Sequence, residues 1–298
     1  MRYYFAPMEG LTDSVYRRLH HEYFGGVDCY YMPFFSPTIH RTLTPKEDRE
    51  LPMADSVPFA AVPQVMTKVA EDFLWAAEQC AQRGYEEVNV NLGCPSGTVV
   101  AKGKGAGMLR DLETLERFLD GIFSQSVLPV SLKTRLGIEN PEEFAALLEL
   151  YNRYPAKELI IHPRTRKQFY NGELYMEQFR YAQEHSKLPL CFNGDIRTKE
   201  DCCKVDVAAV MIGRGLVADP GMLTAEGTTM ARLEQFHDAL LEEYTVVFGS
   251  ARNAISRLKE NWHYLESRFE PDPKLFKRLR KSADIHEYRA ITAELFRK

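Results

Sequence analysis

Short apolar runs alternate with longer amphipathic segments through the first three quarters of the chain. Eight of these runs are rich in Val, Ile, Leu or aromatic residues and predict strands, at residues 3–8, 29–34, 59–65, 87–93, 130–136, 158–162, 189–193 and 208–212. Segments with helical spacing lie between them, at 12–24, 67–83, 111–123, 141–154, 175–185 and 198–204. Such alternation is typical of an α/β protein with a parallel sheet.

The number and order of these elements narrow the fold class. Eight strands separated by helices over about 220 residues favour a (β/α)8 TIM barrel. A doubly wound open sheet is the alternative, because periodicity alone does not show whether a sheet closes on itself. Strand-like runs stop near residue 227, and four helical stretches follow, at 228–247, 252–269, 273–281 and 285–298. We therefore expect a TIM barrel over 1–226 and a small all-helical domain over 227–298.

The charge is distributed asymmetrically along the chain, although the net charge is only −4. Residues 227–298 carry 13 Lys and Arg against 11 Asp and Glu, whereas residues 1–226 carry 25 against 31. The densest basic run is KLFKRLRK at 274–281, whose spacing predicts an amphipathic cationic helix. This helix is either a solvated face or a surface for the phosphate backbone of a nucleic acid.

The cysteines and the apolar runs exclude some classes of protein. The six cysteines form no CxxC pair and no Cys/His spacing typical of zinc, so we expect no metal site and a reducing, cytoplasmic environment; they are Cys29, Cys80, Cys94, Cys191, Cys202 and Cys203. No apolar run approaches the ~20 residues of a membrane span. The apolar run at the N-terminus is interrupted by Pro7 and is too short for a signal peptide.

Polar and charged residues gather at the predicted strand ends. In a TIM barrel the active site lies at the C-terminal ends of the strands. Each such residue alone has an ordinary explanation, such as a surface lysine or a turn histidine, but seven endings together predict a site. They comprise residues 6–10, Gln64, Asn91 with Cys94, Lys133 with Arg135, His162 with Arg164, Asn193-Gly194-Asp195 and Gly213-Arg214.

The last two strand ends indicate a phosphorylated ligand. Loops after the seventh and eighth barrel strands frequently bind phosphate, and Arg214 suits a phosphate group because guanidinium binds it in a bidentate manner. A ring attached to that phosphate would lie near Gln64, Lys133 and His162. FMN fits this description, and Lys133 would offset the negative charge of the reduced ring.

The glycine-rich stretch at 97–107 does not match a standard phosphate-binding loop. GKGAG at 103–107 is neither G-x-G-x-x-G nor a Walker A sequence, because Gly105 follows Lys104 where Ser or Thr is required. Its glycine density predicts a mobile loop over the site instead. Cys94, just before it, is either a reactive group or a small buried turn residue.

Eight segments, in order and at the expected separations, resemble the tRNA-dihydrouridine synthases. They are APMEGLTD (6–13), PQVM (63–66), NVNLGCPS (89–96), KGAG (104–107), KTRLG (133–137), HPRTRKQFYNG (162–172), NGDI (193–196) and MIGRG (211–215). The combination of N-x-x-x-C-P-S, K-x-R-x-G and H-x-R-T-x-x-Q-x-Y-x-G is specific, although no single piece is. A helical segment after the barrel also fits this family.

The resemblance implies a flavin-dependent oxidoreductase that uses NAD(P). FMN at the barrel mouth is reduced by NADPH and passes hydride to C6 of a uridine in tRNA, and Cys94 protonates C5. We expect a monomer, with Asn91, Arg135, Arg164, Lys277 and Arg278 binding the RNA substrate. The implied FMN-binding residues are Pro7, Met8, Gln64, Lys133, His162, Asn193, Gly194, Asp195, Gly213 and Arg214.

Other functions remain open from the sequence. One is an FMN-dependent reductase or dehydrogenase of a free pyrimidine, against which the basic helical segment argues. Another is an enzyme of the same family that acts on a different structured RNA. A third is an RNA-binding or chaperone protein whose barrel has lost catalysis, against which the intact Cys94, Lys133 and His162 argue.

Overall fold

The computed structural model describes residues 1–297 and contains, within them, a sheet of nine parallel strands. The strands are β1 (Arg2–Phe5), β2 (Cys29–Tyr31), β3 (Ala61–Val62), β4 (Gln64–Val65), β5 (Val88–Leu92), β6 (Val130–Arg135), β7 (Leu159–His162), β8 (Leu190–Phe192) and β9 (Ala209–Ile212). Their order in the sheet is β3-β2-β1-β9-β8-β7-β6-β5-β4. All eight predicted strands are confirmed, and the predicted strand 59–65 is divided into two.

This strand order decides between the two predicted fold classes. The two ends of the sheet are β3 and β4, which only Pro63 separates. Phe35, which follows β2, bridges to Val65 of β4 and so continues the pairing across the gap. A proline lacks an N–H and interrupts a ladder, so the strand is broken at the point where the barrel closes. The fold is therefore a nearly closed TIM barrel, and a doubly wound sheet is excluded.

Contacts along the chain divide it into two compact units. The first unit comprises Met1–Pro7, Cys29–Gly194 and Val205–Met211, and the second comprises Met8–Asp28, Asp195–Lys204 and Ile212–Lys298. The second unit thus contains the predicted helical segment together with parts of the predicted barrel sequence. The domain boundary at residue 226 stays a prediction.

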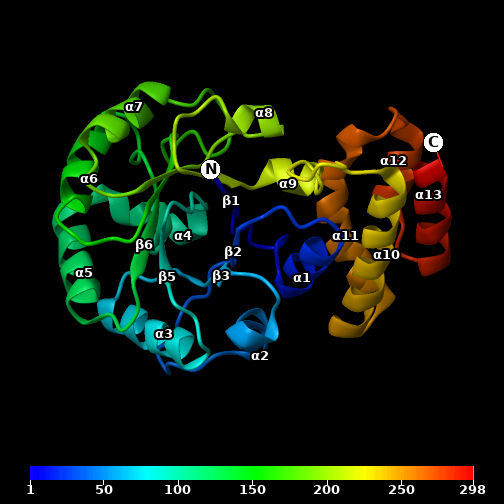
Figure 1. Ribbon diagram of the computed structural model, residues 1–298. Coiled ribbons are helices and arrows are strands. Elements are labelled where there is room, and N and C mark those ends of the chain that lie inside the picture. The colour runs from blue at the N-terminus through cyan, green and yellow to red at the C-terminus, as the bar shows by residue number, and fades with distance from the viewer. Residues whose placement is uncertain (298) are drawn as a thin grey trace. The chain divides into compact units, whose positions relative to one another are not determined.

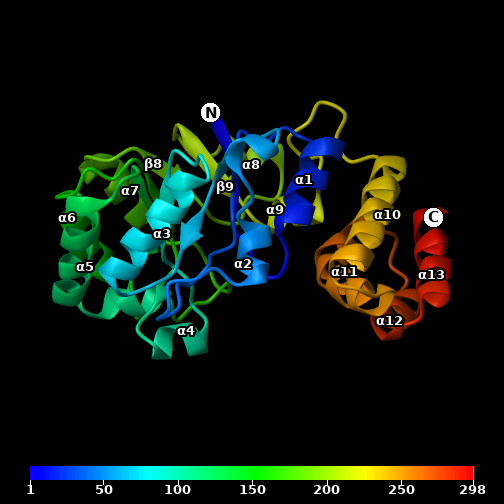
Figure 2. The ribbon, with the colours of Figure 1, turned by 90° about the horizontal axis from the view of Figure 1, so that it is seen from below.

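The first unit is a sheet covered on its outer side by helices (Figures 1 and 2). The covering helices are α3 (Ala70–Gln82), α5 (Leu112–Gln125), α6 (Glu143–Tyr151) and α7 (Met176–His185), and shorter segments are α2 (Pro45–Glu50), η1 (Ala54–Ser56), α4 (Gly97–Ala101) and η2 (Gly105–Arg110). Buried apolar residues of neighbouring strands pack into one core cluster, among them Tyr4, Val62, Ile160, Cys191 and Met211. Each helix buries one apolar stripe against the sheet, as in other α/β folds.

A buried polar cluster lies at the N-terminal end of the barrel strands. Glu158 is 4% exposed; it accepts a hydrogen bond from the Tyr4 hydroxyl at 3.3 Å and pairs with Arg2 at 2.8 Å. Burial raises the pKa of Glu158 to about 7, against which the positive charge of Arg2 acts. A buried carboxylate needs such partners, and here Tyr4 and Arg2 supply them.

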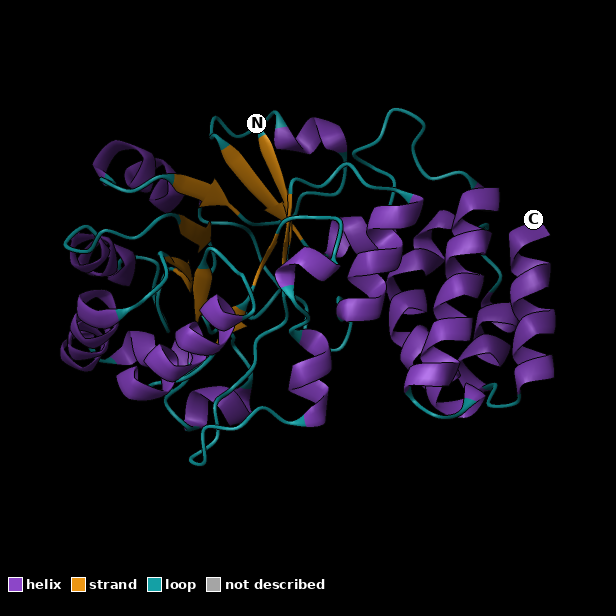
Figure 3. Cartoon of the chain, turned by 60° about the horizontal axis from the view of Figure 1, so that its bottom comes forward, coloured by secondary structure: helices purple, strands orange, loops and turns teal. Residues whose placement is uncertain are grey.

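The second unit is helical. It contains α1 (Ser14–Tyr23), α8 (Lys199–Cys202), α9 (Arg214–Ala218), α10 (Met230–Val247), α11 (Ala251–Leu265), η3 (Glu266–Arg268), α12 (Pro273–Lys281) and α13 (Ile285–Arg297). Figure 3 shows α10 to α13 gathered in a bundle. Aromatic residues fill its core, where the Tyr288 hydroxyl bonds both Trp262 Nε1 and His237 Nε2 at 2.8 Å. The four helices predicted after residue 227 are confirmed, except that the last was predicted to end at Lys298, which lies outside the described residues.

Asp13 fastens α1 to the bundle within this unit. Its carboxylate caps α1 by accepting from the Tyr16 amide at 3.0 Å, and it also accepts from the Tyr244 hydroxyl of α10 at 3.0 Å. Arg257 of α11 donates to the same carboxylate from Nε at 3.1 Å and pairs with it through Nη2. A buried carboxylate needs such partners, so the Asp13 of the APMEGLTD segment has a structural role.

None of the helices described is long and apolar enough to cross a membrane.

Candidate active site at the strand ends

Five polar residues lie at the C-terminal ends of consecutive strands in the first unit. Gln64, Asn91, Lys133 and His162 belong to β4, β5, β6 and β7, and Asn193 directly follows β8. The register places Asn91 opposite Lys133, and Arg135 opposite His162. Parallel strands of a barrel end on the same face, so these residues, predicted from separate motifs, lie on one face of the barrel.

An amide network connects Gln64 to the turn that carries Cys94. Gln64 Nε2 donates to Asn89 Oδ1 at 2.7 Å, and Gln64 Oε1 accepts from Asn91 Nδ2 at 2.8 Å. Asn91 Oδ1 in turn accepts from the backbone amides of Gly93 at 3.1 Å and Cys94 at 2.9 Å. The side chains of Gln64 and Asn91 are buried, and networks of this kind hold a single geometry. Together they fix the backbone of Cys94.

The glycine-rich segment packs directly against Cys94. The Ala106 amide donates to the Cys94 carbonyl at 3.1 Å. A Cβ on Gly105 would lie 2.9 Å from Cys94 Cβ, and one on Gly107 would lie 2.8 Å from the Val100 carbonyl oxygen. Both contacts are too short for any side chain, and Gly105 also has a φ of +55°. Close packing, rather than the predicted mobility, is therefore the physical reason for these glycines.

Lys133 brings a cation into the mouth of the barrel. Its ammonium group donates to Asn193 Oδ1 at 2.8 Å, and Asn193 Nδ2 donates to the Met211 carbonyl at 2.8 Å. Burial and, to a lesser extent, the neighbouring positive charge of Arg135 together lower the pKa of Lys133 to about 8. The ammonium group is therefore held in place at the mouth and is close to its titration range at neutral pH.

Arg135 and Arg164 are buried and bind backbone carbonyls. Arg135 donates to the Gly93 carbonyl at 2.8 Å and to the Thr165 carbonyl at 3.0 Å. Arg164 donates to the Gly172 carbonyl at 3.2 and 2.6 Å. The two residues are 1% and 2% exposed, so their guanidinium groups brace the loops of the mouth. This placement favours a positioning role over the direct substrate contact that the sequence predicted.

Tyr170 is a site residue to which the sequence reasoning assigned no role. Its ring stacks on His162, with ring centroids 6.3 Å apart, and the Arg135 guanidinium lies 5.2 Å from its centroid. Tyr170 is 47% exposed, so one part of the ring remains open beside the strand ends. The preceding Phe169 has a φ of 58°, a left-handed conformation that costs about 1–2 kcal/mol. Tyr170 is the Tyr of the H-x-R-T-x-x-Q-x-Y-x-G segment, and this was the feature of the sequence from which a role for it could have been predicted.

The predicted phosphate-binding residues divide between the two units. Asn193 and Gly194 belong to the first unit, whereas Asp195, Gly213 and Arg214 belong to the second. In the second unit, Arg214 Nη2 pairs with Asp195 Oδ1 at 2.5 Å. Asp195 has a φ of 43°. The pairing indicates that Asp195 orients the Arg214 guanidinium.

Pro7 and Met8 follow β1, as predicted for a strand end. The Met8 amide donates to Thr12 Oγ1 at 2.9 Å, and the Met8 carbonyl accepts from the amides of Leu11 and Thr12 at 3.0 Å. Residues 8–12 thus form a compact turn that leads into the Asp13 cap of α1. The backbone of Met8 is fixed by this turn.

Lys277 and Arg278 lie on the solvent face of α12, whose opposite face buries Leu275, Phe276 and Leu279. Arg278 approaches Glu294 at 4.0 Å, a marginal ion pair. The predicted amphipathic cationic helix is therefore confirmed, and its contact with RNA stays a prediction.

The sequence model described as "Dihydrouridine synthase (Dus)" matches residues 4–296. The chain belongs to the dihydrouridine synthase family. A probable tRNA-dihydrouridine synthase of Rhizobium leguminosarum bv. phaseoli is 28% identical over 277 residues, covering 89% of this chain and 85% of the relative. The tRNA-dihydrouridine(16) synthase of Escherichia coli strain K12 is 28% identical over 300 residues, covering 94% of each chain.

Among solved structures, histamine dehydrogenase from Rhizobium sp. 4-9 resembles this chain with a TM-score of 0.56 at 11% identity. The likeness covers 88% of this chain and 49% of that chain. At this identity it shows the fold alone.

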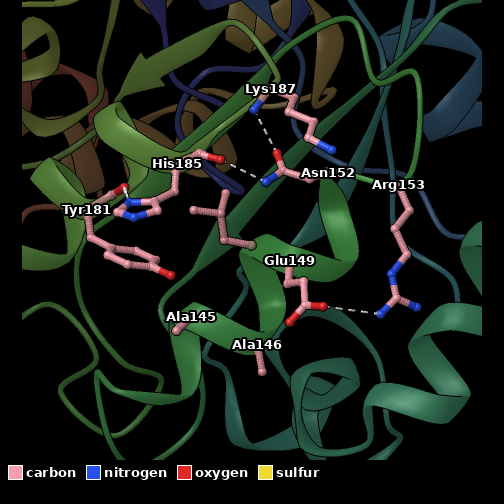
Figure 4. Close-up of a pocket in the computed structure, with 9 residues that line it drawn as sticks. Ala145, Ala146, Glu149, Asn152, Arg153, Tyr181, His185 and Lys187 are labelled. Carbon is pink, nitrogen blue, oxygen red and sulfur yellow. Dashed lines mark hydrogen bonds and ion pairs between the residues drawn. The ribbon is translucent and has the colours of Figure 1, made fainter.

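The protein also has a surface hollow that is separate from the strand-end residues. It has a volume of 640 Å³ and is lined by α6, α7 and the turns after them. Figure 4 shows the Lys187 amide bonded to Asn152, which in turn donates to the His185 carbonyl. Helices of a barrel run opposite to the strands, so these helix ends belong to the strand N-termini. The hollow is not part of the candidate active site.

Proposed function

We propose that the protein reduces the C5=C6 bond of a uridine in tRNA to 5,6-dihydrouridine. The fixed turn of Cys94 beside Lys133 carries this proposal, because it combines a positioned thiol with a cation at the mouth of a barrel. The names of the relatives, two of which are tRNA-dihydrouridine synthases over most of this chain, support tRNA as the substrate.

The residues of the mouth fit a flavin by the chemistry of their donors. The ring edge of a flavin alternates carbonyl acceptors with one N–H donor. Gln64, Lys133, His162 and Asn193 offer amide, ammonium and imidazole groups, and none of these is a carboxylate. They would hold the ring edge with Pro7 and Met8, and Gly194, Gly213 and Arg214 would hold the phosphate. When bound, FMN reduced by NADPH supplies the hydride that reaches C6 of the uracil.

Cys94 supplies the proton in this proposal. Its thiol gives a proton to C5 as C6 receives hydride, and the thiolate is then reprotonated from solvent. An unperturbed thiol has a pKa near 8.5 and is mostly protonated at pH 7, which suits a general acid. Asn91 keeps the thiol in place through the Cys94 backbone amide. We expect the position of the thiol, rather than an activating base, to determine its activity.

The target base must leave the stack of a folded RNA before it can reach the site, at a cost of a few kcal/mol. Phosphate contacts by Lys277 and Arg278 would offset that cost. Arg135 and Arg164, buried as they are, would act by holding the loops that receive the base, and the open side of Tyr170 would lie beside it.

The decisive experiment compares dihydrouridine across total RNA from cells with and without the gene. Loss of the modification at one tRNA position, restored by the wild-type gene, would establish the activity. The purified protein should be yellow, bleach with NADPH, and regain colour when unmodified tRNA is added. Turnover of free uracil or dihydroorotate without RNA would favour the free-pyrimidine enzyme instead. If dihydrouridine is lost only from another RNA, that RNA and not tRNA is the substrate. A colourless protein that does not take up FMN would refute the proposal.

A further inference from the structure

Three lysines gather around the loop that packs on Cys94. Lys68 follows β4, and Lys102 and Lys104 flank Gly103. A Cβ placed on Gly103 would lie 3.7 Å from Lys68 Nζ. The Lys68 ammonium group therefore lies close to the backbone of Gly103, the residue between Lys102 and Lys104. Lys68 and Lys102 are exposed and Lys104 is half-buried. We name these three residues the lysine cluster.

Within the described residues, the lysine cluster lacks the acidic partners that several other cations of the first unit have. Within the described residues 1–297, no carboxylate lies within ion-pair distance of any of the three ammonium groups. Several cations elsewhere on this unit are paired with acids, as in Arg41–Asp72, Arg83–Asp48, Arg117–Glu113, Arg153–Glu116 and Lys157–Glu87. An ammonium group without a carboxylate partner is available to a phosphate, and contacts of this kind bind a polyanion.

The cluster is connected to Cys94 through the same short loop. Gly105 and Ala106 follow Lys104, and both touch Cys94, one through the close approach of Gly105 and the other through the 3.1 Å hydrogen bond from Ala106. A ligand that fixes Lys102 and Lys104 therefore acts on the segment that packs against the thiol. An RNA strand presents a row of phosphates, so several separate ammonium groups can contact it at the same time.

We propose that Lys68, Lys102 and Lys104 bind the RNA phosphate backbone beside the nucleotide whose base reaches Cys94. This inference rests on the proposed function and adds to it a contact surface on the first unit. Lysines act as point charges toward phosphate, without reading sequence. Their contribution should therefore appear in affinity and salt dependence rather than in the chemical step.

The test measures binding of a fluorescent unmodified tRNA transcript to the flavin-loaded protein between 50 and 300 mM salt. Each of Lys68→Gln, Lys102→Gln and Lys104→Gln should reduce the slope of log K against log salt by about 0.7–0.9, and the triple variant by about 2–3. Lys187→Gln is the matched control, because Lys187 is an exposed lysine on the turn after α7. Flavin content and the rate of reduction by NADPH should be unchanged in every variant.

The outcomes separate this inference from the proposed function. If the triple variant keeps the wild-type slope, as Lys187→Gln does, the lysine cluster is not an RNA contact even when the wild-type enzyme makes dihydrouridine. If the slope falls in the triple variant but the wild-type protein makes no dihydrouridine, the lysine cluster is an RNA contact and the proposed reaction is wrong. A triple variant that loses kcat at saturating tRNA with an unchanged KM and slope would also overturn the inference.

Discussion

The backbone amide of Cys94 donates a 2.9 Å hydrogen bond to the side-chain oxygen of Asn91, three residues earlier in the chain. The same oxygen accepts from Gly93, and the Asn91 amide group donates to Gln64. One side chain at the end of β5 thus fixes the backbone that carries the thiol. The two residues belong to a single structural unit, so replacing one should affect the function of the other.

We predict that Asn91→Ala impairs turnover more than binding. It leaves two backbone amides and the Gln64 oxygen without a partner, which costs about 1–3 kcal/mol of folding free energy for a buried group. Urea denaturation measures that loss, and kcat should fall at least tenfold with little change in KM. Asn152→Ala removes a side chain with comparable backbone bonds and should leave kcat unchanged. A stability loss without any loss of kcat would separate Asn91 from the chemistry.

We predict that Cys94→Ala retains FMN and its reduction by NADPH but loses uracil reduction. A general acid contributes about 10²–10⁴-fold, so the rate of dihydrouridine formation should fall within that range. Stopped-flow absorbance separates reduction of the flavin from its reoxidation by tRNA. Cys203→Ala is the control, since Cys203 is an exposed free cysteine. Normal dihydrouridine formation by Cys94→Ala would eliminate the thiol as the proton donor.

We predict that FMN affinity of the apoprotein falls above pH 8. Burial lowers the pKa of Lys133 to about 8, so its positive charge is lost above that value, and affinity should fall by up to tenfold per pH unit. Between pH 8 and the usual lysine range the folded state binds fewer protons than the unfolded state, so folding stability should rise with pH there. Flavin fluorescence titration measures the affinity.

Two variants distinguish the charge of Lys133 from its hydrogen bond to Asn193. Lys133→Arg stays ionised and should give a flat pH profile, whereas Lys133→Met should bind weakly at every pH. If the FMN affinity of Lys133→Met still falls above pH 8, the group that titrates is not Lys133.

The sequence predicted the strands and helices of the fold, whereas the roles of the site residues stay predictions. The position of polar residues at strand ends could be predicted from the sequence, because apolar runs and the turn residues that follow them are local signals. The burial of Arg135 and Arg164 could not be predicted from the sequence. It depends on the carbonyls of Gly93, Thr165 and Gly172, which reach the two guanidinium groups only after folding. Residues that bind substrate and residues that brace a loop use the same side chains, and only tertiary contacts tell them apart.

The glycine-rich segment at 97–107 is a second feature that could not be predicted from local sequence alone. Glycine density predicts flexibility only where no neighbour comes close. At Gly105 and Gly107 the neighbours are Cys94 and Val100, at distances that exclude a Cβ. Likewise, the break in the strand 59–65 depends on Pro63 lying where the barrel closes. Both features become visible only once distant segments are brought together.

We predict that Glu158 makes the protein less stable as pH rises from about 4.5 to 7. Burial raises its pKa to about 7, so in this range the folded state binds more protons than the unfolded state, and stability falls with pH. The full effect is on the order of 3 kcal/mol. Urea unfolding at pH 5 and pH 8 measures it. Glu158→Gln should remove most of the dependence, whereas Glu149→Gln, an exposed residue of α6, should keep it.

We predict that the lysines of α12 contribute to RNA affinity through salt-dependent contacts. Within residues 1–297, Lys274, Lys277 and Lys281 have no carboxylate within ion-pair distance, whereas Arg280 pairs with Glu266 at 3.0 Å. Replacing the three lysines by Ala should reduce the salt slope of tRNA binding by about 2–3. Arg280→Ala should change it less, because the paired charge is already partly neutralised.

Lys204→Ala provides the control for α12, because Lys204 is exposed and pairs with Asp201 at 2.6 Å. Melting temperature should stay close to wild type in all of these variants, because the apolar face of α12 formed by Leu275, Phe276 and Leu279 is untouched. A salt slope that survives in the triple α12 variant, with wild-type affinity at each salt concentration, would remove α12 from the RNA interface. Arg278→Ala, tested alone, then shows whether the guanidinium opposite Glu294 contacts RNA independently of the lysines.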